Sequence, residues 1–140
     1  MRRVLLAAWL ASMMTACMLG PTPASVDVST WARGVAGTLA TARDSGSAEL
    51  LAVQGDTALL VLRAQRVMLV SYTAITRAQF GGNGAYPRVL LSNGRAPSVD
   101  EAAKLRLQSR FPQGVNAALQ RRLLAAYGQN ALLVVGRPGS

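Results

Sequence analysis

Reactive side chains are few in this sequence, and their types limit the chemistry available to it. The 140 residues include one cysteine, Cys17, and no histidine. Histidine is the commonest general base near neutral pH, activates the serine of hydrolytic triads, and completes many zinc sites. A serine–lysine pair would need Lys104, the single lysine, which follows Asp100 and Glu101 and is expected to form solvated ion pairs with them. These residues predict neither nucleophilic catalysis nor a metal site, and one cysteine cannot form a disulfide within the chain.

Carboxylates and glycine loops also fail to suggest a catalytic arrangement. Asp56 is expected in a hairpin turn, and Asp100 and Glu101 in the first turn of a helix, where the helix dipole favours negative charge. The run Gly81-Gly82-Asn83-Gly84 lacks the lysine of a phosphate-binding loop, so we interpret it as a connecting loop. We predict a protein that is not an enzyme, with no catalytic residues, no metal and no cofactor.

The charge of the chain is strongly positive, with 15 lysines and arginines against 6 acids and a net charge of +9. Removal of the segment 1–16 would take away Arg2 and Arg3 and leave 13 against 6, or +7. A basic surface concentrates anionic partners. Candidate contacts for such a partner are four arginines on two predicted helices: Arg106, Arg110, Arg121 and Arg122. The alternative is that these arginines line solvated helix faces.

The N-terminus has the organisation of an export signal. Met1-Arg2-Arg3 is positively charged, and Val4–Met14 is an apolar run that is long enough for a signal peptide but short for a spanning helix. The small residues Thr15 and Ala16 lead directly to Cys17. We interpret residues 1–16 as a cleaved signal peptide.

The stretch Met14-Thr15-Ala16-Cys17 resembles the bacterial lipobox, with methionine where leucine is usual. The resemblance implies a diacylglyceryl thioether on Cys17, cleavage before it, and acyl chains that hold the protein firmly at a membrane. By resemblance to the sorting rule of enterobacterial lipoproteins, Met18 in place of aspartate favours the outer membrane of the cell envelope. Residues 17–28 would be the lipidated cysteine and a proline-stiffened tether.

Two other interpretations of the leader are open. Val4–Gly20 would serve as an uncleaved anchor, although a run of this length is marginal for spanning a bilayer. Alternatively, an ordinary signal peptidase would cut after Thr22-Pro23-Ala24 and release a soluble secreted protein.

A helix is predicted over Ser29–Arg43, where apolar residues recur at helical spacing: Trp31, Val35, Leu39 and Ala42. Two interior glycines oppose it, at about 1 kcal/mol each. Three short runs rich in leucine and valine then predict an antiparallel meander: Ala48–Gln54, Thr57–Arg63 and Arg66–Tyr72. Two-residue breaks separate them, at Gly55-Asp56 and Ala64-Gln65. This meander resembles strands of small SH3-like barrels, including the Sm-like group, over about 35 residues, and the likeness concerns the fold alone.

Thr73–Phe80 would close the meander as a helical turn or a further strand. Tyr86–Ser92 predicts an edge strand, because Pro87 near its start cannot donate a ladder hydrogen bond. Asn93-Gly94 marks a turn after it.

The last third of the chain changes to a helical period. Ser98 and Glu101 predict a capping box, and the helix they start would end near Arg110. A second helix is expected over Asn116–Tyr127, with Gly128 as its cap, and Asn130–Val135 predicts a final strand. Between the helices, the string Ser109–Gly114 contains Arg110 and Gln113 as candidate ligand contacts. We favour a structural linker there, with Phe111 filling the core.

Together these elements predict an α+β fold: a mostly antiparallel sheet or small barrel-like meander of about five strands, with an N-terminal helix and two C-terminal helices. One domain would cover residues 29–136, followed by a loose tail at 137–140.

The expected function is that of a membrane-anchored envelope lipoprotein, a non-catalytic binding or structural module. Its partners would be membrane lipid, through Cys17, and anionic envelope components. The alternative is a small basic nucleic-acid-binding barrel with the leader misread, which an aromatic content of only 5% disfavours.

Overall fold

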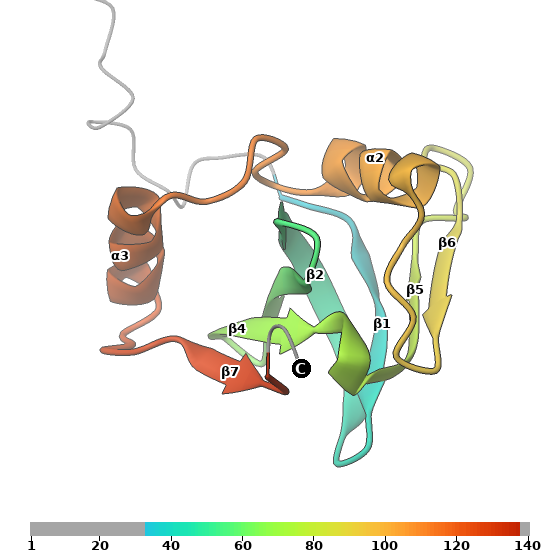
Figure 1. The fold of residues 1–140 in the computed structure, drawn as a ribbon. Coiled ribbons are helices and arrows are strands. Elements are labelled where there is room, and N and C mark those ends of the chain that lie inside the picture. The colour runs from blue at the N-terminus through green and yellow to red at the C-terminus, as the bar shows by residue number, and fades with distance from the viewer. Residues whose placement is uncertain (1–32, 138–140) are drawn as a thin grey trace, which may run out of the picture. The chain divides into compact units, whose positions relative to one another are not determined.

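The computed structural model describes residues 33–137, which belong to one compact unit of the chain, Trp31–Ser140. Within these residues lie seven strands, one 3-10 turn and two helices (Figure 1). In chain order they are β1 (Ala36–Thr41), β2 (Ser45–Gln54), β3 (Ala58–Arg63), β4 (Arg66–Ser71), η2 (Tyr72–Ala74), β5 (Ile75–Phe80), β6 (Val89–Ser92), α2 (Val99–Gln108), α3 (Ala117–Ala126) and β7 (Leu133–Val135).

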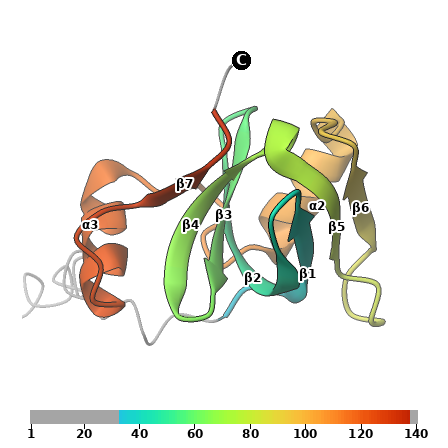
Figure 2. The same cartoon turned by 90° about the horizontal axis from the view of Figure 1, so that it is seen from below.

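All seven strands form one sheet in the order β6-β5-β1-β2-β3-β4-β7. Neighbouring strands are antiparallel except β4 and β7, which are parallel. Figure 2 shows β7, β4 and β3 toward one end of this order and β5 and β6 at the other. The predicted α+β class and mostly antiparallel sheet are therefore confirmed, whereas the described residues hold seven strands instead of about five.

The helix predicted over Ser29–Arg43 is wrong for residues 36–41, which form β1; residues 29–32 lie outside the described residues. β1 pairs with β2 on one side and with β5 on the other, so ladder hydrogen bonds replace the helical ones. Gly37 suits this strand, because a Cβ there would clash with the carbonyl of Gln79 and lie 2.5 Å from the Phe80 ring. Glycine permits the close approach of β5 that any larger residue would block.

The predicted meander is confirmed as β2, β3 and β4, joined by short turns. Residues 73–80 combine the two alternatives, because η2 ends at Ala74 and β5 begins at Ile75. β6 is the predicted edge strand, although it starts at Val89, two residues after Pro87. Asn93 and Gly94, both with positive φ, form the turn after it.

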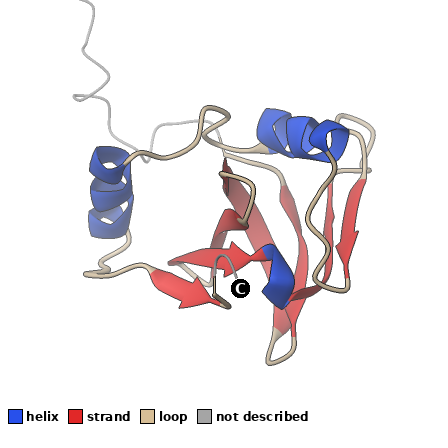
Figure 3. Ribbon diagram, in the orientation of Figure 1, coloured by secondary structure: helices blue, strands red, loops and turns tan. Residues whose placement is uncertain are grey.

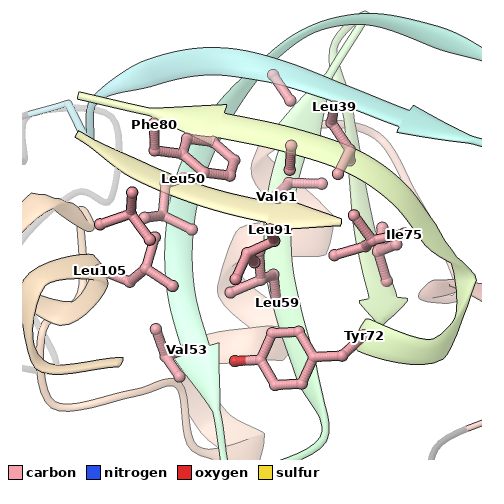
Figure 4. Close-up of a cluster of buried hydrophobic side chains, with 14 residues drawn as sticks. Leu39, Leu50, Val53, Leu59, Val61, Tyr72, Ile75, Phe80, Leu91 and Leu105 are labelled. Carbon is pink, nitrogen blue, oxygen red and sulfur yellow. The ribbon is translucent and has the colours of Figure 1, made fainter. Parts of the chain in front are cut away.

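The core cluster combines side chains from the β5–β6 end of the sheet, from its central strands and from α2. Phe80 of β5 and Leu91 of β6 pack in one cluster with Leu50 of β2 and Leu59 of β3, and α2 adds Leu105 (Figure 4). Further side chains are buried outside this cluster: Leu51, Leu60, Val67, Phe111 and Leu123. The central strands therefore bury residues on both faces, which explains their nearly continuous apolar sequence.

Both C-terminal helices form, joined by an irregular linker (Figure 3). The capping box of α2 is confirmed: Glu101 N–H donates to Ser98 Oγ at 3.2 Å, and Ser98 N–H donates to Glu101 Oε2 at 2.8 Å. α2 ends at Gln108, two residues before the expected Arg110. Phe111 in the linker is buried, as predicted.

α3 begins after Asn116, whose side chain accepts from Leu119 N–H, and Gly128 follows it with φ of +65°. β7 covers only the last half of the predicted Asn130–Val135 strand, and it joins the sheet beside β4. Gln129 fixes this region, because its amide donates to Val67 C=O at 3.1 Å and accepts from Val67 N–H at 2.6 Å. No helix within residues 33–137 is long and apolar enough to cross a bilayer.

Candidate polar hollow around Glu49 and Arg110

The structure does not bring the four candidate arginines together. Arg106 lies on α2, whereas Arg121 and Arg122 lie on α3, and these helices stand apart in both views (Figures 1 and 2). Arg121 is exposed, and Arg106 and Arg122 are half-buried. The side chain of Arg110 is only 3% exposed. A basic face running across both helices is therefore wrong, and Arg110 is not a surface contact. Cys17, the predicted lipidation site, lies outside the described residues.

Arg110 is buried because it forms a two-point ion pair with Glu49. Its Nε donates to Glu49 Oε1 at 2.8 Å, and its Nη2 donates to Oε2 at 3.1 Å. The backbone N–H of Gly34 donates to the same Oε1 at 2.8 Å. Three donors thus satisfy a carboxylate whose side chain is 13% exposed, which offsets the cost of removing it from water.

Strand register places Glu49 in the middle of β2, opposite Ala36 of β1 and Leu62 of β3. Directly opposed residues of neighbouring strands share a face of the sheet, so a small and an apolar residue flank the carboxylate. The chain after α2 delivers Arg110 to this face: Arg110 N–H donates to Leu50 C=O at 3.1 Å. Phe111 N–H donates at 2.8 Å to the carbonyl of the next residue of β2, at a bulge in the strand.

The segment before β1 also contacts β2 and the end of α2 at this place. Val35 N–H donates to Gln108 C=O at 2.8 Å, and Leu50 N–H donates to Val35 C=O at 3.0 Å. Gly34 must be glycine here, because a Cβ would clash with the Leu50 carbonyl and lie 2.8 Å from the backbone nitrogen of Arg110. Three segments distant in sequence therefore meet around one ion pair.

A surface hollow of about 370 Å³ lies beside the pair. Its lining comes from the segment before β1 (Arg33, Gly34), from β1 to β3 (Ala36, Ser47, Ala48, Glu49, Leu62), from the turn between β3 and β4 (Ala64, Gln65), and from beside the two helices (Arg110, Tyr127). Arg110 Nη1 donates to the Tyr127 hydroxyl oxygen at 3.5 Å. The lining carries two positive charges and one negative charge, a net charge of +1.

The turn on the rim of this hollow is strained. Ala64 and Gln65 have φ of +48° and +62°, in the left-handed region. Two-residue hairpin turns of this kind favour Asn-Gly, because other side chains are crowded there. Strain of this sort persists only where surrounding structure imposes it, and it gathers at functional sites.

The charges elsewhere in residues 33–137 are unevenly distributed. Four of the five acids there form ion pairs with basic side chains: Asp44 with Arg63, Glu101 with Arg95, Asp100 with Lys104, and Glu49 with Arg110. Seven arginines outside these ion pairs are exposed: Arg33, Arg43, Arg66, Arg77, Arg88, Arg121 and Arg137. The positive excess of the domain therefore faces solvent.

Glu49, Arg33 and Tyr127 are not predicted by the sequence as residues of one site. Glu49 carried a usable signal, because it is the one charged residue in the leucine-rich run Ala48–Gln54. A charge at such a position needs a partner, and buried charges are paired. Arg33 and Tyr127 carried no such signal.

Among residues 33–137 there is no group of three or more histidine, cysteine or acidic side chains that could hold a metal ion. No protein-family model matches the chain, and neither a curated protein nor a solved structure matches it.

Proposed function

We propose that this chain is a lipoprotein of the bacterial cell envelope, anchored through Cys17, whose folded domain is a non-catalytic module that binds anionic envelope components. The anchor is supported by residues 1–17: a charged start, an apolar run of signal-peptide length, and the lipobox-like Met14-Thr15-Ala16-Cys17. Met18 favours the outer membrane over the inner one.

The placement of charge carries the binding part of the proposal. Most of the acids in residues 33–137 are engaged in ion pairs within the domain, while seven arginines outside those pairs are exposed to solvent. Such a surface attracts anions, and arginine binds phosphate and carboxylate in a planar fork. In an envelope these groups belong to lipid headgroups, lipopolysaccharide and anionic polymers.

The proposal includes an SH3-like small barrel as the scaffold. It is supported by the β2–β4 meander with its short turns, by the one-turn η2 between β4 and β5, and by the return of β5 to pair with β1. β6, β7 and the two helices would be additions to that unit.

Intact mass spectrometry of the membrane fraction tests the anchor, with wild type compared against Cys17→Ala. We expect a chain beginning at Cys17 with a lipid-sized mass increment, absent from the variant. An unlipidated chain in the soluble envelope fraction would show that the anchor is wrong. An unmodified chain that retains Met1 in the cytosol would favour the alternative, nucleic-acid binding.

A comparison of the affinities for two anionic polymers tests the binding role. The full chain in a non-ionic detergent is titrated into fluorescently labelled lipopolysaccharide and into labelled single-stranded DNA at increasing salt. We expect tighter binding to lipopolysaccharide, weakening as salt screens the arginines. Tighter binding to DNA would reverse the assignment, because the same exposed arginines also attract nucleic-acid phosphates.

A further inference from the structure

We propose that the hollow beside Glu49 and Arg110 binds a single oxyanion group, a carboxylate or a phosphate, between the Arg33 guanidinium and the Tyr127 hydroxyl. This proposal deepens the anion-binding role proposed above and rests on it, but it does not need the lipid anchor. It adds a defined subsite to what would otherwise be diffuse attraction by a basic surface.

The charges of the lining select an anion. Glu49 is the only acid among the lining residues, and its Oε1 accepts from Arg110 and from Gly34 N–H while its Oε2 accepts from Arg110. A cation entering the hollow would therefore find a neutralised carboxylate and the positive charge of Arg33. An anion entering the hollow would be attracted by the net charge of +1 on its lining.

Arg33 supplies the direct charged contact. Its side chain is exposed at the hollow and makes no hydrogen bond or ion pair within the described part of the chain. Its backbone is nevertheless fixed, because the next two residues donate to Glu49 Oε1 and to Gln108 C=O. An arginine held in place, with no partner for its donors among residues 33–137, is suited to a two-point contact with a carboxylate or phosphate.

Tyr127 supplies a second donor, oriented by the ion pair. Its phenol oxygen accepts from Arg110 Nη1 at 3.5 Å, and its own O–H donates to no other group among residues 33–137. A hydroxyl that accepts from a charged donor becomes a stronger donor itself. Glu49 orients Arg110, Arg110 orients Tyr127, and the O–H of Tyr127, which has no acceptor bonded to it within residues 33–137, would donate to the ligand.

The other residues that line the hollow indicate what the rest of the ligand would contact. Ala36 and Leu62 offer a small apolar surface next to the charged groups. Gln65, which also lines the hollow, adds an amide. A ligand with one oxyanion and a short apolar part fits this set, and most small-molecule sites combine apolar walls with a few convergent polar groups.

Nuclear magnetic resonance of the full chain in a non-ionic detergent tests the subsite. The probes are inorganic phosphate and dihexanoyl phosphatidylglycerol, which separate a free anion from a lipid headgroup. Three variants are compared with wild type: Arg33→Ala, Tyr127→Phe, and the matched control Arg43→Ala, which removes an arginine between β1 and β2 that is also exposed but does not line the hollow.

We expect chemical-shift changes concentrated on the hollow with at least one probe. Arg33→Ala should weaken binding roughly tenfold or more, since a hydrogen bond to a charged group contributes about 1.5–3 kcal/mol. Tyr127→Phe should weaken it several-fold, and Arg43→Ala less than about twofold. A response to phosphate alone identifies a soluble anion as the ligand, and a response to the phospholipid alone identifies a headgroup.

Equal losses in Arg33→Ala and Arg43→Ala would overturn the subsite while leaving the general anion-binding function standing. Shift changes spread over all exposed arginines would do the same. If neither probe binds while lipopolysaccharide still does, the subsite again fails alone. If lipopolysaccharide also fails to bind, the proposed function fails with it.

Discussion

Glu49 and Arg110 lie 61 positions apart in the chain, yet their side chains form a two-point ion pair with contacts of 2.8 and 3.1 Å. The pair attaches the linker after α2 to the middle of β2, beside backbone hydrogen bonds from Arg110 and Phe111 to the same strand. Because Gly34 N–H also donates to Glu49, the pair ties the chain before β1 into the same junction. The pair therefore joins three segments of the fold at one place.

Removal of one member of the pair should destabilise the domain more than removal of both. Glu49→Leu leaves a buried guanidinium without its partner, and we expect a loss of about 3–5 kcal/mol in the free energy of unfolding. The double variant Glu49→Leu with Arg110→Met should lie within about 1 kcal/mol of wild type, since apolar packing can replace a buried pair. Urea denaturation measures both.

Lys104→Ala is the control for this cycle, because its pair with Asp100 is exposed and should contribute only about 0.5 kcal/mol. Arg110→Met alone completes the cycle. If the effects of Glu49→Leu and Arg110→Met simply add in the double variant, the buried pair is not coupled and the interpretation is wrong.

The turn at Ala64 and Gln65 should be improved by residues that tolerate positive φ. Replacement by Asn-Gly should raise the free energy of unfolding by about 1–2 kcal/mol, because it relieves left-handed strain at two positions. The reverse change is available at the turn after β6, where Asn93 has φ of +55° and Asn93→Ala should destabilise by about 1 kcal/mol. Thermal denaturation compares the two, and a destabilised Asn-Gly variant would show that Ala64 and Gln65 contribute contacts that outweigh their strain.

Local sequence pattern predicted the meander and the two C-terminal helices well. Their signals lie within a few residues, such as the Ser98–Glu101 capping box and the two-residue breaks between leucine-rich runs. β1 was missed because Leu39 and its neighbours also fit a helical period. What decides the outcome is pairing with β5, which lies beyond three intervening strands in the chain, and the room that Gly37 leaves for Phe80.

The site was harder to predict for the same reason. Arg110 was singled out, but as an exposed contact, since nothing near it in sequence indicates that Glu49 will bury it. Glu49 could have been flagged as a charge within an apolar strand. Its partner among the many arginines, and the approach of Arg33 and Tyr127, depend on how the linker crosses β2.

Stability at low pH should depend on Glu101. Hydrogen bonds from the Arg95 side chain, and then from the Ser98 backbone, lower the pKa of Glu101 from 4.5 to about 2. A carboxylate with a lowered pKa in the folded state stabilises it above pH 4.5, and this contribution disappears as pH falls toward 2. The pair is at the surface, so the effect should be about 0.5–1 kcal/mol. Glu101→Gln keeps the capping geometry, and its urea midpoint should fall less than that of wild type over this pH range. Urea midpoints that fall equally with pH in the two proteins would contradict the assignment of this pH dependence to Glu101.

Tyr72→Phe should stabilise the domain, because the Tyr72 hydroxyl is buried in the core without a hydrogen-bond partner among residues 33–137. Removal of an unsatisfied buried hydroxyl should raise the free energy of unfolding by about 1–2 kcal/mol.

Burial raises the pKa of Tyr72 from 10.0 to about 12, against the opposing charge of Arg106. The unfolded chain therefore ionises first, and wild type should lose stability between pH 10 and 12 while Tyr72→Phe loses less. Tyr86→Phe, at an exposed tyrosine, should change the urea midpoint little. A destabilised Tyr72→Phe would mean that the hydroxyl has a partner in solution, and the core would then contain a bound polar group at this position.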